Sequence, residues 1–137
     1  MKRMASVLVA ATLDVGVLAG CSQGGAATGD TIKIGVNYEL SGGVATYGQA
    51  SVQGIKMAAD EINAAGGIKG KKIQLVEYDN KSEPAEATTL ATKLMTSDKV
   101  VASIGPATSG NFKATVPVAT QYKIPVVSGS ATADDVT

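Results

Sequence analysis

Short apolar segments alternate with longer amphipathic ones along this chain, and that alternation limits the possible folds more than any other feature. Four segments have the length and composition of buried strands, and the three between them carry apolar residues at helical spacing. We expect Pro117 to kink or split the last helix, because proline cannot donate the helical hydrogen bond. The pattern predicts an α/β fold built on a doubly wound parallel sheet. The predicted strands are Thr31–Val36, Lys72–Tyr78, Val100–Ile104 and Ile124–Ser128, and the predicted helices are Gly48–Ala65, Pro84–Ser97 and Gly110–Tyr122.

The composition argues against several classes of function. The 137 residues carry 12 Lys+Arg and 12 Asp+Glu, so the net charge is zero and we expect no polyanion-binding surface and no nucleic-acid partner. The chain has no His, which removes the commonest general base and the commonest metal ligand. Its single Cys cannot form an internal disulfide or a thiolate cluster. We therefore expect no enzymatic activity, no metal and no cofactor.

Residues 1–20 have the order of a secretory signal peptide. Lys2 and Arg3 give a positive start, and an apolar run then extends from Met4 to Leu18. Residues 5–20 would span only about 24 Å as a helix, less than the roughly 30 Å hydrocarbon core of a bilayer. Asp14 interrupts the apolar run, and an acidic residue there opposes membrane insertion.

Leu18-Ala19-Gly20-Cys21 resembles the lipobox of bacterial lipoproteins. The resemblance implies that the chain is cut before Cys21 and that the Cys21 thiol carries a lipid. Residues 21–30 contain no large apolar residue after the cysteine and predict a flexible tether, which leaves residues 31–137 as the folded body. The alternatives are an ordinary buried cysteine and an N-terminal segment with no tethering role.

Three loops rich in Gly, Ser and Thr follow the predicted strands, at 39–48, 105–110 and 129–133. In open α/β sheets, ligands bind beyond the carboxyl ends of the strands. Ser109 lies where the third helix begins, and a helix start attracts anions; the alternative is that Ser109 only caps that helix. Ser130 and Thr132 could be simple turn residues. Tyr47 could wall a pocket or lie on the surface, and Asp79 is expected to be a solvated turn residue.

Several catalytic and nucleotide motifs are missing. Gly70-Lys71 lacks the upstream glycine of a phosphate loop, and no Gly-x-Gly-x-x-Gly follows the first strand. Ser109 has no His partner, so a hydrolase triad is excluded. An intracellular nucleotide-using enzyme is thus disfavoured.

The chain resembles the N-terminal lobe of branched-chain amino-acid binding proteins, the receptors of ABC uptake transporters with the type I periplasmic-binding fold. The resemblance rests on four blocks in the order and spacing of that family, including the turn Ala-Ala-Gly-Gly-Ile-Lys-Gly. The blocks are IKIGVNYELSGGVATYGQ at 32–49, GIKMAADEINAAGGIKGKKIQLVEYDNKSEP at 54–84, IGPATSG at 104–110 and IPVVSGSAT at 124–132.

The resemblance implies roles for individual residues. Ser109, with Gly110 as a further amide donor, matches the position that holds the ligand carboxylate. Ser130, through its backbone carbonyl, and Thr132 match the positions that meet the ammonium group. Tyr47 and Ala107 match positions that line the pocket of the aliphatic side chain. The predicted ligand-binding residues are Ser109, Gly110, Ser130, Thr132, Tyr47, Ala107 and Thr108.

The resemblance also implies what lies outside this chain. A second lobe is missing, and the first lobe is incomplete because the family finishes it with segments that return later. The expected function is a lipid-anchored, extracytoplasmic protein that captures leucine, isoleucine, valine or a related amino acid and delivers it to ABC permease subunits. The alternatives are a ligand-sensing receptor without a transport role, and binding of amides, urea or other small acids.

Overall fold

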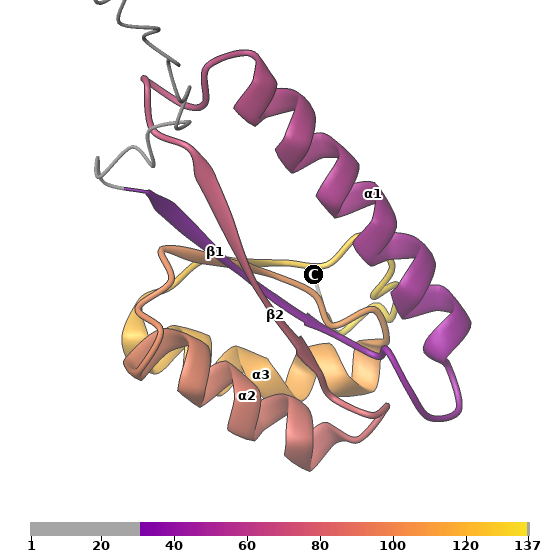
Figure 1. The fold of residues 1–137 in the computed structure, drawn as a ribbon. Coiled ribbons are helices and arrows are strands. Elements are labelled where there is room, and N and C mark those ends of the chain that lie inside the picture. The colour runs from indigo at the N-terminus through magenta and orange to yellow at the C-terminus, as the bar shows by residue number, and fades with distance from the viewer. Residues whose placement is uncertain (1–30, 137) are drawn as a thin grey trace, which may run out of the picture.

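The computed structural model describes residues 31–136. The predicted signal peptide, Cys21 and the tether lie outside the described residues. Seven elements follow one another along the chain in Figure 1. They are β1 (Ile32–Tyr38), α1 (Ala45–Ala64), β2 (Ile73–Asp79), α2 (Pro84–Thr96), β3 (Ala102–Ile104), α3 (Ser109–Tyr122) and β4 (Val126–Val127).

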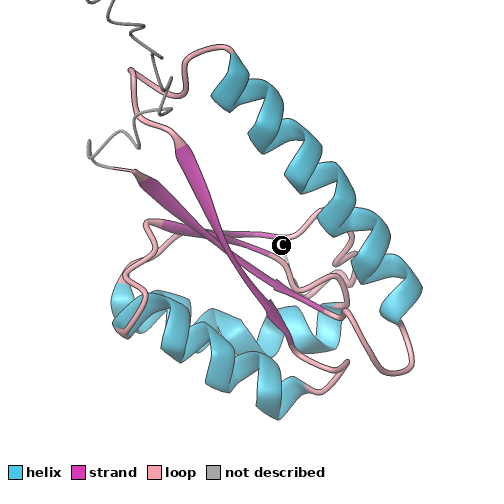
Figure 2. Cartoon of the chain, in the orientation of Figure 1, coloured by secondary structure: helices cyan, strands magenta, loops and turns pink. Residues whose placement is uncertain are grey.

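The four strands form one parallel sheet in the order β2-β1-β3-β4. Helix α1 covers one face of the sheet, while α2 and α3 pack side by side on the other face, as Figure 2 shows. The doubly wound α/β architecture predicted from the sequence is confirmed. Among the described helices, none is both long and apolar enough to cross a membrane.

The observed bounds differ from the predicted ones by up to three residues, and β3 and β4 are shorter than predicted. Strand β1 continues two residues past Val36 to Tyr38, because its last residues are buried and pair with Tyr78 and Asp79 of β2. Helix α1 begins at Ala45, three residues before Gly48. Helix α3 runs without a break past Pro117, so the proline does not split it.

The connections that leave the neighbouring strands β1 and β3 run to opposite faces of the sheet. Strands β1 and β3 are neighbours, with Val36 opposite Ile104, but the chain leaves β1 toward α1 and leaves β3 toward α3 on the other face. The two loops therefore diverge and open a crevice at the carboxyl ends of these strands, which is where ligands bind in such sheets.

Two glycines allow both loops to pack directly on the end of β1. A β-carbon on Gly48 would lie 2.0 Å from the carbonyl oxygen of Glu39, so only glycine lets the first turn of α1 approach that strand end. Gly105 has a φ of +91°, and a β-carbon there would lie 2.3 Å from the carbonyl oxygen of Asn37. Both loops that border the crevice are thus held against β1.

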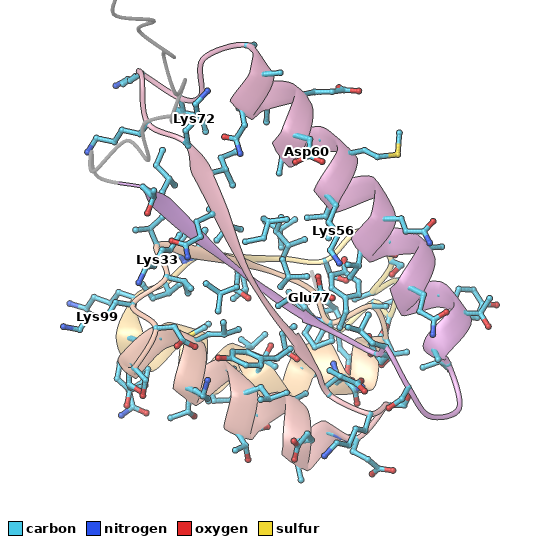
Figure 3. All side chains as sticks on the ribbon, viewed as in Figure 1. Lys33, Lys56, Asp60, Lys72, Glu77 and Lys99 are labelled. Atoms are coloured by element: carbon cyan, nitrogen blue, oxygen red, sulfur yellow. The ribbon has the colours of Figure 1, made fainter. Side chains whose placement is uncertain are left out.

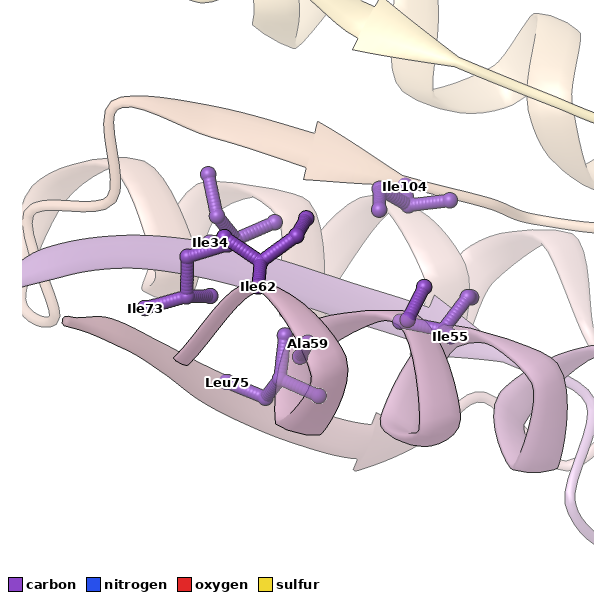
Figure 4. Close-up of a pocket in the computed structure, with 8 residues that line it drawn as sticks. Ile34, Ile55, Ala59, Ile62, Ile73, Leu75 and Ile104 are labelled. Atoms are coloured by element: carbon purple, nitrogen blue, oxygen red, sulfur yellow. The ribbon is translucent and has the colours of Figure 1, made fainter. Parts of the chain in front are cut away.

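An apolar hollow of about 160 Å³ lies between α1 and the sheet (Figure 4). Its lining is entirely aliphatic, so it offers no partner to a charged or polar ligand. The single helix on this face leaves Ile62 of α1 39% exposed, whereas Leu94 beneath α2 on the other face is fully buried. The lining residues are Ile34, Ile55, Ala58, Ala59, Ile62, Ile73, Leu75 and Ile104.

Replacing Leu94 by Ala should destabilise the protein by about 2–5 kcal/mol, because the truncation leaves a cavity beneath α2. Met57→Ala on the exposed side of α1 is the control and should change the free energy of unfolding by less than about 0.5 kcal/mol. Urea unfolding of the full-length protein measures both. Equal effects of the two substitutions would contradict this description of the core.

Candidate functional site

A hollow of about 290 Å³ opens at the carboxyl ends of β1, β3 and β4. The loops after these three strands all contribute to it, as the sequence predicted for a shared polar site. Its lining combines apolar side chains with hydroxyls and contains no charged residue. The lining residues are Val44, Tyr47, Ala107, Thr108, Ser109 and Ser130.

Five of the seven residues predicted to bind a ligand line this hollow. Ala107 is buried in its floor, whereas Tyr47 is 71% exposed at its rim. Gly110 follows as the second residue of α3 but is not part of the lining. Thr132 is exposed and also lies outside the lining, so the described structure does not bring it into the hollow.

Ser109 does not cap α3, so the capping alternative is wrong. It is the first residue of the helix, and Thr108 occupies the N-cap position. The backbone N–H of Ala133 donates a hydrogen bond to Ser109 Oγ at 3.1 Å. An oxygen that already accepts this bond keeps its own hydrogen for a further partner, so Ser109 can donate into the hollow.

The segment after β4 is fastened to the loop before α3 by two serine hydroxyls. Ser128 Oγ donates to the carbonyl of Pro106 at 2.7 Å, and Ser130 Oγ donates to the carbonyl of Ala107 at 2.9 Å. Ser130 therefore uses its hydroxyl for structure. Ser128 is the last residue of a predicted strand, and the sequence analysis did not identify it as a residue of the site.

A buried carboxylate holds the start of α3 in place. Glu39 follows β1 directly and is fully buried. It accepts hydrogen bonds from the backbone N–H of Ala107 at 2.9 Å and of Thr108 at 3.2 Å. It also accepts from Thr108 Oγ1 at 2.9 Å and from Asn111 Nδ2 at 2.9 Å. Four donors on the β3–α3 segment thus converge on the Glu39 side chain directly after β1.

The hydrogen bonds keep the Glu39 carboxylate charged. Burial by itself raises the pKa, but the bonds from Ala107 and Thr108 outweigh it and hold the pKa of Glu39 below its usual value. Two buried asparagines extend the network, because Asn80 Nδ2 donates to Asn37 Oδ1 at 3.2 Å and Asn37 Nδ2 donates to the carbonyl of Ala87 at 2.9 Å. Asn111 Nδ2 donates to Asn80 Oδ1 at 3.5 Å and joins these two asparagines to the Glu39 network, which thus reaches from α3 to α2.

Asp79 is a structural anchor, which corrects the expectation of a solvated turn residue. Its carboxylate accepts hydrogen bonds from the N–H groups of Leu40, Ser41 and Lys81 at 2.8–3.0 Å. Ser41 Oγ donates a further bond at 2.6 Å. Although burial acts in the opposite direction, these bonds hold the pKa of Asp79 below its usual value. The loop after β1 is therefore pinned to the end of β2.

The site can bind a small polar head and an apolar tail but supplies no obvious reacting group. Among residues 31–136, the backbone N–H groups of Ser109 and Gly110 at the start of α3 donate to no other residue, so they are open to an anion. The aliphatic and aromatic part of the lining suits a hydrocarbon side chain. No group of three acidic or cysteine side chains that could hold a metal occurs within the described part of the chain.

Glu39→Gln should destabilise the protein by about 2–4 kcal/mol, because it removes a charged acceptor from buried donors. The lowered pKa means that Glu39 adds stability above its unfolded pKa, and that this contribution disappears as the pH falls through the folded value. The difference in unfolding free energy between wild type and Glu39→Gln should therefore be largest near neutral pH and shrink below about pH 4. Chemical denaturation across pH measures it, and a difference that stays constant down to pH 3 would contradict the assignment.

Comparison with known proteins agrees with the fold. The sequence profile of a periplasmic binding protein family matches residues 31–137. The Leu/Ile/Val-binding protein of Escherichia coli K12 is 34% identical over 124 residues, which cover 88% of this chain and 34% of that protein. The chain thus spans about a third of the relatives it matches.

Two solved structures superpose on most of the chain. One is a branched-chain amino acid transporter substrate-binding protein from Streptococcus pneumoniae in complex with isoleucine, with a TM-score of 0.77 and 54% identity over 78% of this chain and 31% of that one. The other is an ABC transporter solute-binding protein from Rhodopseudomonas palustris in complex with 3,4-dihydroxybenzoic acid, with a TM-score of 0.72 and 30% identity over 79% of this chain and 29% of that one. The sheet with its three helices matches a lobe of the type I periplasmic-binding fold, and the chain belongs to the periplasmic binding protein family.

Proposed function

We propose that this chain is the N-terminal ligand-binding lobe of an extracytoplasmic protein that captures a branched-chain or related amino acid for uptake through an ABC permease. The observation that carries the proposal is the hollow at the start of α3, where unpaired backbone amides and the Ser109 hydroxyl adjoin an apolar wall. The isoleucine complex of the Streptococcus relative supports the choice of ligand class.

The carboxylate of the amino acid binds at the start of α3. Ser109 Oγ donates to it, and the N–H of Gly110 lies next along the helix as a second donor. The helix dipole adds favourable charge at this end. Arg3 is the only arginine among residues 1–137 and belongs to the predicted signal peptide, so residues 21–137 offer no bidentate guanidinium contact.

The ammonium group and the side chain bind on the other walls of the hollow. The carbonyl of Ser130 and the hydroxyl of Thr132 accept from the ammonium group, and Thr132 has to move toward the hollow to do so, because it is exposed outside the lining. Val44, Tyr47 and Ala107 surround the aliphatic side chain. Binding involves no covalent step, in keeping with relatives that are transporter binding proteins. A second lobe closes over the ligand by hinge motion.

Titration calorimetry with leucine, isoleucine and valine tests the ligand class. We expect at least one of the three to bind the full-length protein with micromolar affinity or better, since the apolar wall removes the side chain from water. Arginine and glutamate serve as controls, because the lining offers no charged partner for their side chains. Absence of heat with all three aliphatic amino acids would refute the assignment.

Ser109→Ala should weaken binding of the preferred amino acid by about 1–3 kcal/mol, because the variant loses a hydroxyl donor to a charged group. Ser97→Ala, at the C-terminal end of α2, is the matched control and should leave the affinity unchanged. An unchanged dissociation constant for the Ser109 variant would show that this hydroxyl does not contact the ligand.

The proposal includes a lipid anchor at Cys21. Growth of expressing cells with a labelled fatty acid should label the wild-type protein, because Cys21 follows the lipobox-like Leu18-Ala19-Gly20. Cys21→Ser should abolish the label, and Cys21 is the only cysteine, so no other thiol can substitute for it. Equal labelling of both proteins would refute the anchor.

The 3,4-dihydroxybenzoic acid complex of the Rhodopseudomonas relative favours a second candidate, a small aromatic acid. Such a ligand would use the same carboxylate donors at the start of α3 but would need no ammonium partner. Including 3,4-dihydroxybenzoate and benzoate in the titration separates the two candidates, because the amino-acid proposal requires the aliphatic amino acids to bind more tightly.

A further inference from the structure

Six lysines gather at the edge of the sheet where its strands begin, opposite the ligand-binding hollow. All four strands are parallel, so the segments that precede them meet at one edge. We call this surface the lysine edge. It consists of Lys33 in β1, Lys69, Lys71 and Lys72 before β2, Lys99 before β3 and Lys123 before β4.

Backbone bonds fix the lysine edge across the sheet. The N–H of Ile32 donates to the carbonyl of Lys72 at 2.9 Å, and the N–H of Val101 donates to the carbonyl of Lys33 at 3.0 Å. Figure 3 shows Lys33, Lys72 and Lys99 at the edge where β1 and β2 start. All members of the lysine edge except Lys33 are exposed.

Three lysines of the edge, Lys69, Lys99 and Lys123, form no ion pair with another described residue. Asp98 lies within it, but its carboxylate is 3.6 Å from Lys93 Nζ and is thus already paired. Asp60 and Glu61 lie near the end of α1 on its exposed surface. The charges of Lys69, Lys99 and Lys123 therefore remain on the described part of the edge and make it positive.

The opposite edge carries the reverse charge. Acidic residues predominate in the loops after the strands and in the first turn of α2. The described lysines at this edge, Lys81 and Lys113, are paired with Glu86 and Asp135. The zero net charge of the sequence therefore conceals an uneven distribution of charge between the two edges of the sheet. The acidic residues are Glu39, Asp79, Glu83, Glu86, Asp134 and Asp135.

Part of this polarity has a local cause. Parallel strands direct every helix C-terminus to the edge where strands begin, and lysines there interact favourably with the helix dipoles. Lys123 at the C-cap of α3 and Lys99 shortly after α2 fit this explanation. It does not account for Lys33 in a strand or for Lys69, Lys71 and Lys72 in a turn before a strand.

We propose that the lysine edge rests on an anionic phospholipid surface and turns the ligand-binding hollow away from it. The described chain begins at Thr31, directly beside Lys72, so the predicted lipid at Cys21 is attached to this same edge. Ten residues reach at most about 35 Å, which keeps the edge near the membrane. Each lysine close to an anionic leaflet adds attraction. The proposal rests on the lipid-anchored location in the proposed function.

Vesicle flotation with the full-length protein carrying Cys21→Ser tests the edge without the anchor. Vesicles contain phosphatidylcholine alone or with roughly 30% phosphatidylglycerol. We expect binding only to the anionic vesicles, and weaker binding as salt rises from about 0.05 to 0.5 M. The triple variant Lys69→Gln, Lys99→Gln, Lys123→Gln should bind at least about tenfold more weakly.

The matched control is Lys56→Gln, Lys81→Gln, Lys113→Gln, which changes the net charge equally away from the edge and should keep the binding. Equal loss in both triple variants, or no preference for anionic vesicles in the unsubstituted chain, would overturn the proposal. Preference for soluble polyphosphate without vesicle binding would also overturn it. Amino-acid titration of the edge variant should match wild type, so failure of ligand binding and failure of the lysine edge are separate results.

Discussion

The hydrogen bonds of the buried Glu39 carboxylate are the contacts on which the rest of the site depends. They join the end of β1 to the Ala107–Thr108 backbone and to Asn111 on the first turn of α3. The two loops around the crevice leave β1 and β3 toward opposite faces of the sheet. A contact between the loops is therefore needed to fix their relative position. A charged acceptor does this better than a neutral one, since bonds to a carboxylate are stronger. Glu39 also accepts from the backbone N–H groups of Ala107 and Thr108, whereas those of Ser109 and Gly110 donate to no other described residue.

The remaining contacts around the hollow follow the same pattern of side chains bonded to backbone. Asp79 accepts hydrogen bonds from the loop after β1. Ser128 and Ser130, after β4, donate hydrogen bonds to the loop before α3. Side-chain hydrogen bonds of this kind fix loops that lack regular secondary structure. The apolar hollow beside α1 has none of these partners, which explains why the two hollows differ in what they can bind.

The direction of the strands also separates charge. A parallel sheet places all helix starts at one edge and all helix ends at the other, and Glu86 and Lys93 at the two ends of α2 suit the helix dipole. The composition shows only their sum, which is zero. The separation of charge becomes visible in the folded chain, where Lys33, Lys72 and Lys99 lie at the edge at which the strands begin (Figure 3).

The sequence by itself determined the element order, the parallel sheet and the three polar loops, because periodicity and turn residues are local properties. It placed Tyr47, Ala107, Thr108, Ser109 and Ser130 near one another through the rule that strand ends converge. Only the tertiary structure decided that Glu39 and Asp79 are anchors, that Ser109 accepts from Ala133, and that Thr132 lies outside the hollow. The contacts of Glu39 with α3, of Asp79 with Leu40 and Ser41, and of Ser109 with Ala133 join residues 24 to 72 positions apart, and no local pattern encodes such pairings.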